Sequence, residues 1–240
     1  VDIFFVSKIG VNAIAVVGLT ESMLTITYSL GWGLAMGTTA MIARRVGEGD
    51  NDGASVSAVQ SIYLALIISV PIMLCGVFFS EDLLRLMGAT NEVISEGSGY
   101  TKLTLGFNLI VILLFLINGI FRGAGDAALA MRSLWIANSI NIVLDPMLIF
   151  GIGPFPELGI EGAALATIIG RSFGILYQLY HLGKGKGLIK IHKDNWHFKP
   201  IIIWKLVKLS SGVTAQFIIS SASWIFLMRI ISTFGSTALA

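Results

Sequence analysis

A carboxylate and two carboxamides interrupt a long apolar stretch, and their spacing suits the binding of a cation. Asp145 is the only charged residue between positions 133 and 156. Asn138, Asn141 and Asp145 are spaced three and four residues apart, so on a helix they project from one face. Because an ionisable group inside lipid is costly unless it meets a cavity or a partner, we expect this face to point away from lipid.

Two interpretations of Asp145 remain open at this point. A buried carboxylate can bind and release a proton, or it can bind a cation together with a neutral oxygen such as that of Asn141. Alternatively, Asp145 braces the helix beside Pro146, where the missing N–H leaves a carbonyl without its helical partner. We favour the functional interpretation because ionisable residues inside membranes usually mark ion or proton pathways.

Asp2 is a second candidate for the same site. It lies six residues before Lys8, and Asp145 lies six residues before Gly151. At the helical rise, each carboxylate is ~9 Å inside the nearest turn, so the two could share a layer of the membrane. The first residues, 1–6, resemble the end of a hydrophobic span, and we therefore expect the chain to be a fragment.

Other residues inside the apolar runs have a structural explanation and a functional one. Arg171 could pair with an aspartate, which we favour, or extend toward the membrane interface. Small residues at helical spacing, namely Gly33 with Gly37 and Gly119 with Gly123, predict close helix packing. Tyr28 and Met36 could line an adaptable cavity, although such residues are also common in plain helix packing.

The composition predicts an all-α polytopic membrane protein. Hydrophobic residues make up 55% of the 240 residues and charged residues 12%, and the mean hydropathy is +0.84. The net charge of +2 gives no reason to expect a nucleic-acid partner. The single cysteine excludes a disulfide within this sequence, and the three histidines lack the spacing of a metal site, so we expect no metal centre of that kind and no cofactor.

Uncharged runs of membrane length predict the crossings. Besides the run that holds Asp145, they are Ser22–Ala43, Ala54–Ser80, Leu103–Phe121, Gly162–Gly183 (interrupted by Arg171) and Leu209–Met228. The connection 81–102 contains one amphipathic turn, which predicts a short interfacial helix.

Basic residues predict the orientation of the crossings. If Arg44 and Arg45 are cytoplasmic, that side carries eleven Lys and Arg residues, including seven lysines between 184 and 208. The segments 9–15 and 234–240 resemble each other, as expected if one repeat ends near Gly183 and a second begins near Trp204. The lysine-rich stretch would then connect two lobes.

Several motifs in the right order resemble the multidrug and toxic compound extrusion (MATE) family, and look closest to its DinF-like branch. They are GLAMGTTAMIAR at 33–44 with GEGD at 47–50, FRGAGD at 121–126, and residues 138–145 continuing through GPFPELG into GAALAT at 162–167. The resemblance implies a six-helix N-terminal lobe with a truncated first helix at 1–183, a basic cytoplasmic connector at 184–203, and the first helix of a C-terminal lobe at 204–240.

The resemblance also implies an activity and a site. The implied activity is antiport, in which H⁺ or Na⁺ drives the export of drugs or other amphipathic or cationic molecules across the cytoplasmic membrane. The family's cation site maps onto Asp2, Asn141, Asp145 and Thr167 of this sequence. Implied partners are a small-molecule substrate, the lipid bilayer and the missing second lobe.

Three other functions are alternatives to export. A lipid-linked oligosaccharide flippase of the same superfamily is expected to line its cavity with several basic residues, whereas only Arg171 lies deep in a crossing. An intramembrane enzyme would need converging histidines or a serine with a base, which the pattern does not indicate, so we expect no enzyme. A purely structural subunit would leave Asp145 unexplained.

Overall fold

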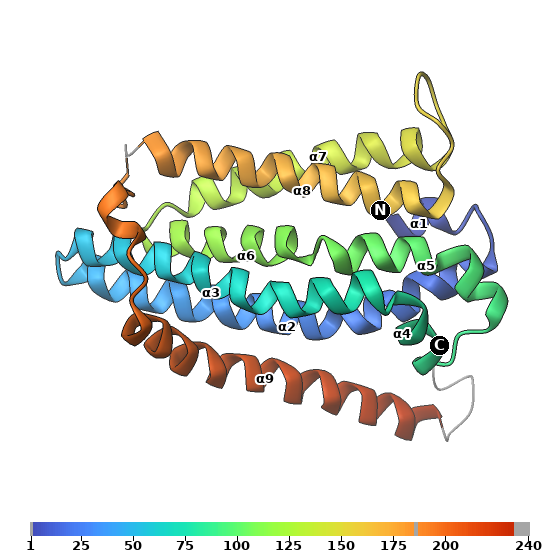
Figure 1. Ribbon diagram of the computed structural model, residues 1–240, viewed down its shortest axis with the longest axis horizontal. Coiled ribbons are helices and arrows are strands. Elements are labelled where there is room, and N and C mark those ends of the chain that lie inside the picture. Colours follow the sequence, from blue (N-terminus) through green and yellow to red (C-terminus); the bar gives the residue numbers. More distant parts are fainter. Residues whose placement is uncertain (1, 185–186, 233–240) are drawn as a thin grey trace.

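The computed structural model describes residues 2–184 and 187–232, and Figure 1 shows a bundle of long helices running side by side. Within these residues the chain is helical and contains no strand. The elements, in order, are α1 (Asp2–Val6), α2 (Val11–Gly47), α3 (Asn51–Phe78), α4 (Ser80–Leu86), α5 (Asn91–Gly106), α6 (Asn108–Gly123), α7 (Ala127–Ile149), α8 (Gly159–Lys184), the 3-10 turn η1 (Lys193–Trp196) and α9 (Pro200–Ser232).

The described part of the chain offers six helical stretches that are long and apolar enough to cross a membrane. They correspond to α2, α3, the α5–α6 pair, α7, α8 and the first part of α9. This result confirms the predicted all-α polytopic membrane protein. The amphipathic turn that follows the second crossing is helical, as α4.

Three crossings begin much earlier than the uncharged runs predicted, and α2 is one of them, since it starts at Val11 rather than Ser22. The α5–α6 stretch starts at Asn91 rather than Leu103, because Thr90 caps it by accepting a hydrogen bond from the Val93 amide. Its charged residues are exposed while Val93 and Tyr100 are buried, so the charges did not end the helix. Helix α9 starts at Pro200 rather than Leu209; proline suits a first helical position, where no N–H is needed.

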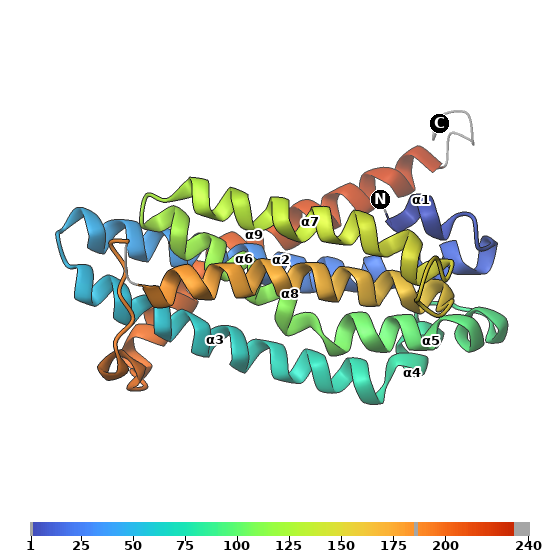
Figure 2. The same ribbon diagram turned by 90° about the horizontal axis from the view of Figure 1, so that it is seen from above.

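Helix α2 lies in the middle of the bundle, and small residues let its neighbours approach closely (Figures 1 and 2). A β-carbon added to Gly119 on α6 would lie 2.6 Å from the Ala35 carbonyl oxygen of α2. A β-carbon added to Gly33 or Gly37 of α2 would meet the side chain of Thr214 or Ser210 of α9. The prediction of close packing at these glycines is therefore confirmed.

The basic connector is attached to α3 by side chains that bond its backbone. The Gln60 amide donates to the His197 carbonyl and accepts from the Lys199 amide, both over 2.8 Å, and Gln60 is fully buried. The Tyr63 hydroxyl donates to the Trp196 carbonyl over 2.9 Å. Figure 1 shows the connector passing the end of α3 before α9 turns back along the bundle.

Only the first copy of the predicted internal repeat lies within the described residues. Its first copy, 9–15, covers the turn before α2 and the first residues of that helix. Its second copy, 234–240, lies outside the described residues.

Candidate functional site

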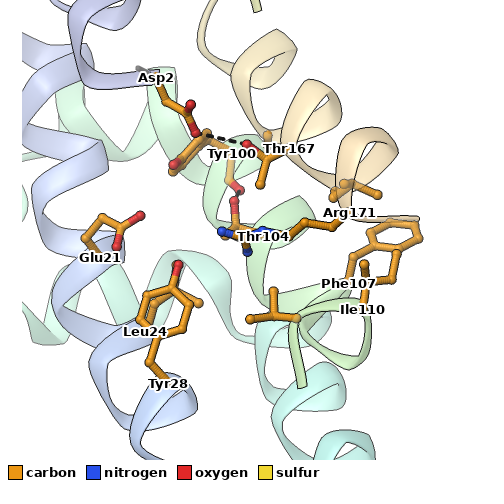
Figure 3. A pocket seen from close by; sticks show the side chains of 13 residues that line it. Asp2, Glu21, Leu24, Tyr28, Tyr100, Thr104, Phe107, Ile110, Thr167 and Arg171 are labelled. Carbon is orange, nitrogen blue, oxygen red and sulfur yellow. Dashed lines mark hydrogen bonds between the residues drawn. The ribbon is translucent and has the colours of Figure 1, made fainter. Parts of the chain in front are cut away.

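Four side chains from three helices are joined by one hydrogen-bonded chain. The Asn141 amide on α7 donates to an Asp145 carboxylate oxygen and to the Thr167 hydroxyl, each over 3.1 Å. The Thr167 hydroxyl on α8 in turn donates to the Asp2 carboxylate on α1 over 2.9 Å, as Figure 3 shows. The structure thus brings together Asp2, Asn141, Asp145 and Thr167.

Close packing of α7 against α8 places these groups within reach of one another. A β-carbon on Gly170 would lie 2.6 Å from the Ala137 carbonyl oxygen and 3.2 Å from the Asn141 β-carbon. At the other end of the contact, a β-carbon on Gly162 would lie 2.5 Å from the Leu148 carbonyl oxygen. Only glycine permits these approaches, so the sequence itself fixes the spacing between the two helices at the site.

Asp145 is the most enclosed group of the site. Its side chain is 0% exposed, and one carboxylate oxygen accepts from Asn141. Its other carboxylate oxygen has no hydrogen-bond partner within the described chain, although buried polar atoms normally have one. Nor does any hydrogen bond there join Asp145 to the backbone around Pro146. This arrangement leaves an oxygen available for a proton or a cation.

A cavity lies beside the hydrogen-bonded chain, and Figure 3 shows its lining. Its volume is about 30 Å³. A cavity of this size can accommodate water, an ion or a small polar group. Its lining consists of Asp2, Glu21, Leu24, Tyr28, Tyr100, Thr104, Phe107, Ile110, Val111, Ala164, Thr167, Ile168 and Arg171.

The remaining predicted residues divide into two pairs. Tyr28 and Arg171 line the cavity. Met36 is 46% exposed, Asn138 is exposed as well, and neither belongs to the lining. Asn138 lies on the helical face of Asp145, but two turns earlier, where the described chain leaves α7 uncovered.

The predicted ion pair of Arg171 does not form. Among the described residues, no carboxylate lies within 4.0 Å of its guanidinium, and the salt bridges present involve other arginines. Asp2 and Asp145 are instead engaged through hydroxyl and amide groups. Arg171 reaches into the cavity, as Figure 3 shows.

Glu21 is a cavity residue that the sequence pattern did not single out. It stands directly before the uncharged run 22–43, which predicts a crossing that begins after it. Because α2 begins at Val11, Glu21 instead lies within the helix and points into the cavity (Figure 3). The apolar character of residues 13–19 was the signal that the helix starts earlier.

The sequence of this chain matches a family model and several known proteins. The MatE family model matches residues 1–147. A FAD transporter of Shewanella oneidensis is 33% identical over 167 residues, covering 70% of this chain and 37% of that protein. A probable multidrug resistance protein of Bacillus subtilis, YoeA, is 26% identical over 235 residues, covering 97% of this chain and 51% of that protein.

Solved structures agree with the sequence matches. A MOP superfamily transporter from Pyrococcus furiosus superimposes with a TM-score of 0.89 at 30% identity, covering 99% of this chain and 52% of that one. An inward-facing MATE transporter gives a TM-score of 0.85 at 31% identity, with 99% and 53% covered. The chain spans about half the length of these transporters and of YoeA, and less of the FAD transporter. With the family model matched across more than half its length, the chain belongs to the MatE family of multidrug and toxic compound extrusion transporters.

Proposed function

We propose that this chain is the N-terminal lobe, with the first helix of the second lobe, of a cation-coupled antiporter. The complete transporter exports drugs or other amphipathic or cationic small molecules across the cytoplasmic membrane, driven by the entry of H⁺ or Na⁺. The observation that carries the proposal is the hydrogen-bonded chain from Asp145 through Asn141 and Thr167 to Asp2, with one buried carboxylate oxygen unpartnered.

The donor set suits either coupling ion. Two carboxylates, an amide and a hydroxyl provide oxygen ligands of the kind that hard cations prefer, and either carboxylate can accept a proton instead. A bound cation between Asp2 and Asp145 would relieve their mutual repulsion. This change would draw α1 toward α7 and α8. Because the turn at 7–10 joins α1 to α2, the movement would also reach α2.

Coupling then requires that the ion and the substrate favour different conformations of the lobe. Ion loading must lower the affinity for the substrate, and by linkage the substrate must lower the affinity for the ion by the same factor. Asp2 and Thr167 both line the cavity, so the ion site and the cavity share residues. A change at one is therefore felt directly at the other.

The names of relatives support export of small molecules but differ in the substrate. YoeA is called a probable multidrug resistance protein, and the Shewanella protein a FAD transporter. The basic residues at 44–45 and 184–208 support a cytoplasmic location for the α2–α3 turn and for the connector. The ion site then lies in the half of the bundle farther from the cytoplasm, at the end away from the connector (Figure 1).

The test is efflux of a fluorescent cationic dye by the complete transporter in proteoliposomes. Sodium and pH gradients are imposed separately, with the membrane potential clamped in both cases. We expect one gradient to drive efflux and the other to have little effect. Equal efflux with neither gradient imposed would contradict ion coupling.

A further inference from the structure

An exposed apolar stripe runs along α3 and leads to the basic connector. Ile67, Val70, Leu74 and Phe78 are between 43% and 71% exposed, and their spacing of three and four residues puts them on one face of the helix. Tyr63 lies four residues before Ile67 and continues this face toward the connector. An apolar face that the described chain leaves uncovered, on a helix of membrane length, suits contact with lipid acyl chains. Tyr63 then lies at the end of the stripe where acyl chains give way to headgroups.

Two aromatic rings of the connector pack on Tyr63 at that end of the stripe. The ring centroids of Trp196 and Phe198 lie 6.0 and 5.8 Å from the ring centroid of Tyr63. Trp196 is 47% exposed and Phe198 56%, so each residue contacts the bundle and still presents free surface. Trp and Tyr are typical of the membrane–water interface, where the apolar ring meets lipid and the polar edge meets water. The rings therefore favour a position of the connector at the level of the headgroups.

The connector lies beside the bundle rather than beyond its tip. Gln60 bonds the backbone of both His197 and Lys199, and it is nine residues after Asn51, the first residue of α3. Nine residues correspond to ~14 Å along the helix. Figure 2 shows the connector, in orange, alongside α3 and short of the α2–α3 turn. A segment in this position can meet the surface of the bilayer.

Exposed lysines flank the two rings on a backbone that α3 holds in place. The amide of Lys199 donates to Gln60 over 2.8 Å, and the amide of Lys190 donates to Ser55 over 3.0 Å. Ser55 and Gln60 are five residues apart, so the two attachment points are ~8 Å apart along α3. Both lysines are exposed, and among the described residues no carboxylate lies within 4.0 Å of either ammonium group. Their charges are therefore available to a negatively charged partner.

Membrane topology explains the number of lysines but not this arrangement. Between positions 184 and 208 the sequence holds seven lysines and one acidic residue, Asp194, a bias that is typical of cytoplasmic loops. That bias depends on a count of charges and requires no fixed shape. Here four hydrogen bonds attach the backbone to α3, and Ile189 is only 5% exposed, while rings and lysines stay exposed. A fixed surface that combines rings with lysines is suited to binding a partner.

We propose that the connector surface, formed by Lys190, Trp196, Phe198 and Lys199 next to Tyr63, binds anionic phospholipids of the leaflet that it faces. The ammonium groups attract the negative headgroup, the rings lie at the level of the glycerol, and the acyl chains follow the stripe of α3. Continuity with this apolar stripe favours a lipid over a free phosphate, which would contact neither the rings nor the stripe. The proposal goes beyond export, and it requires neither ion coupling nor a particular substrate.

The experiment uses the complete transporter in phosphatidylcholine nanodiscs that contain a small fraction of a photoreactive lipid. One probe is a phosphatidylglycerol and the other a phosphatidylcholine, and both carry the same diazirine near the glycerol end of one acyl chain. After illumination, mass spectrometry of the digested protein measures labelling of the peptides that contain Tyr63 or residues 188–199. The quantity compared is the ratio of labelling by the anionic probe to labelling by the zwitterionic probe.

We expect this ratio to be well above one, and Lys190→Gln or Lys199→Gln to lower it about fivefold, the factor that corresponds to ~1 kcal/mol for one basic residue near an anionic surface. Lys199→Arg keeps the charge and should keep the ratio. Lys102→Gln removes an exposed lysine from α5, away from the connector, and should leave the ratio unchanged. Each glutamine variant retains six of the seven lysines between 184 and 208, so the orientation of the protein is preserved.

Labelling by the zwitterionic probe also reports folding, since a variant that keeps this labelling is intact at the connector. A ratio near one for the unmodified transporter would overturn the proposal, as would a ratio that neither glutamine variant lowers. Absence of labelling by both probes would mean that the second lobe covers the surface, and would overturn it as well. So would loss of the anionic labelling on addition of soluble glycerol phosphate, because the surface would then bind free phosphate. Efflux is not measured, so the result is independent of the proposed ion coupling.

Discussion

The Thr167 hydroxyl on α8 donates a hydrogen bond of 2.9 Å to the Asp2 carboxylate on α1, across 165 positions of sequence. Within the described chain, no other side-chain hydrogen bond joins α1 to α7 or α8. Thr167 also accepts from Asn141, so one hydroxyl links the two acidic residues of the site. The position of α1 against the bundle therefore depends in part on this small side chain, together with the buried apolar cluster that Val6 shares with Ile149 and Ile160.

Replacing Thr167 by valine tests that dependence, because valine keeps the shape and removes the hydroxyl. We expect Thr167→Val to raise the coupling-ion concentration needed for half-maximal efflux about tenfold, as for loss of a hydrogen bond to a charged group. Thr167→Ser keeps the hydroxyl and should stay close to the unmodified transporter. An unchanged ion dependence in Thr167→Val would remove the hydroxyl from the ion site.

Helical periodicity in the sequence predicts that two of the four site residues lie together. Asn141 and Asp145 are four residues apart in an apolar run, and helical periodicity alone puts them on one face. The approach of Asp2 to Thr167 has no local signal, since it depends on how α1 folds back onto α8. It was expected only through the resemblance to a transporter family.

The misplaced helix starts share one cause. Uncharged runs predict where the crossings lie, but each run stops at the first charged residue, whether or not the helix does. In this bundle, Glu21 faces a cavity and Glu92 is exposed, and both lie within helices. A charge that has a solvated or protein-lined environment does not interrupt a helix, and the sequence alone does not reveal that environment.

Gly119→Ala should destabilise the lobe, because its β-carbon would lie 2.6 Å from the Ala35 carbonyl oxygen, and the backbone cannot yield as a side chain would. Overpacking of this kind costs about 1–3 kcal/mol, which we expect to appear as a lower melting temperature in detergent. Gly18→Ala is the matched control on α2, where an added β-carbon meets nothing within 4 Å. Equal melting temperatures for the two variants would refute the close approach of α2 and α6.

Gln60→Leu should loosen the connector. The change removes the partners that now lie 2.8 Å from the Lys199 amide and the His197 carbonyl, at a cost of about 1 kcal/mol for each lost hydrogen bond. We expect chymotrypsin to cleave after the exposed Trp196 or Phe198 faster than in the unmodified transporter. Tyr63→Phe removes only one bond from an intermediately exposed ring and should have a smaller effect. An unchanged rate of cleavage in Gln60→Leu would mean that these hydrogen bonds do not hold the connector against α3.

Asp50 gives a prediction about pH outside the membrane. The Gly53 amide donates to this carboxylate over 2.9 Å, and Arg45 lies beside it, so the pKa of Asp50 is lowered from its usual 3.8. Its stabilisation of the α2–α3 turn is therefore complete above that value, and it disappears as the pH falls through the lowered pKa.

Melting temperatures of the unmodified transporter and Asp50→Asn, measured from pH 7 down to pH 3, test this linkage. We expect the unmodified transporter to be more stable at neutral pH and the difference to shrink in acid. A difference for Asp50→Asn that is constant across the range would contradict the assignment.

The most direct test of the account concerns the unpartnered oxygen of Asp145. Asp145→Asn keeps the size of the side chain and removes its capacity to bind a proton or pair with a cation. In proteoliposomes with the driving gradient imposed, we predict that the variant loses ion-driven dye efflux while it still binds the dye at equilibrium. Undiminished ion-driven efflux by Asp145→Asn would contradict the claim that this carboxylate is loaded with the coupling ion.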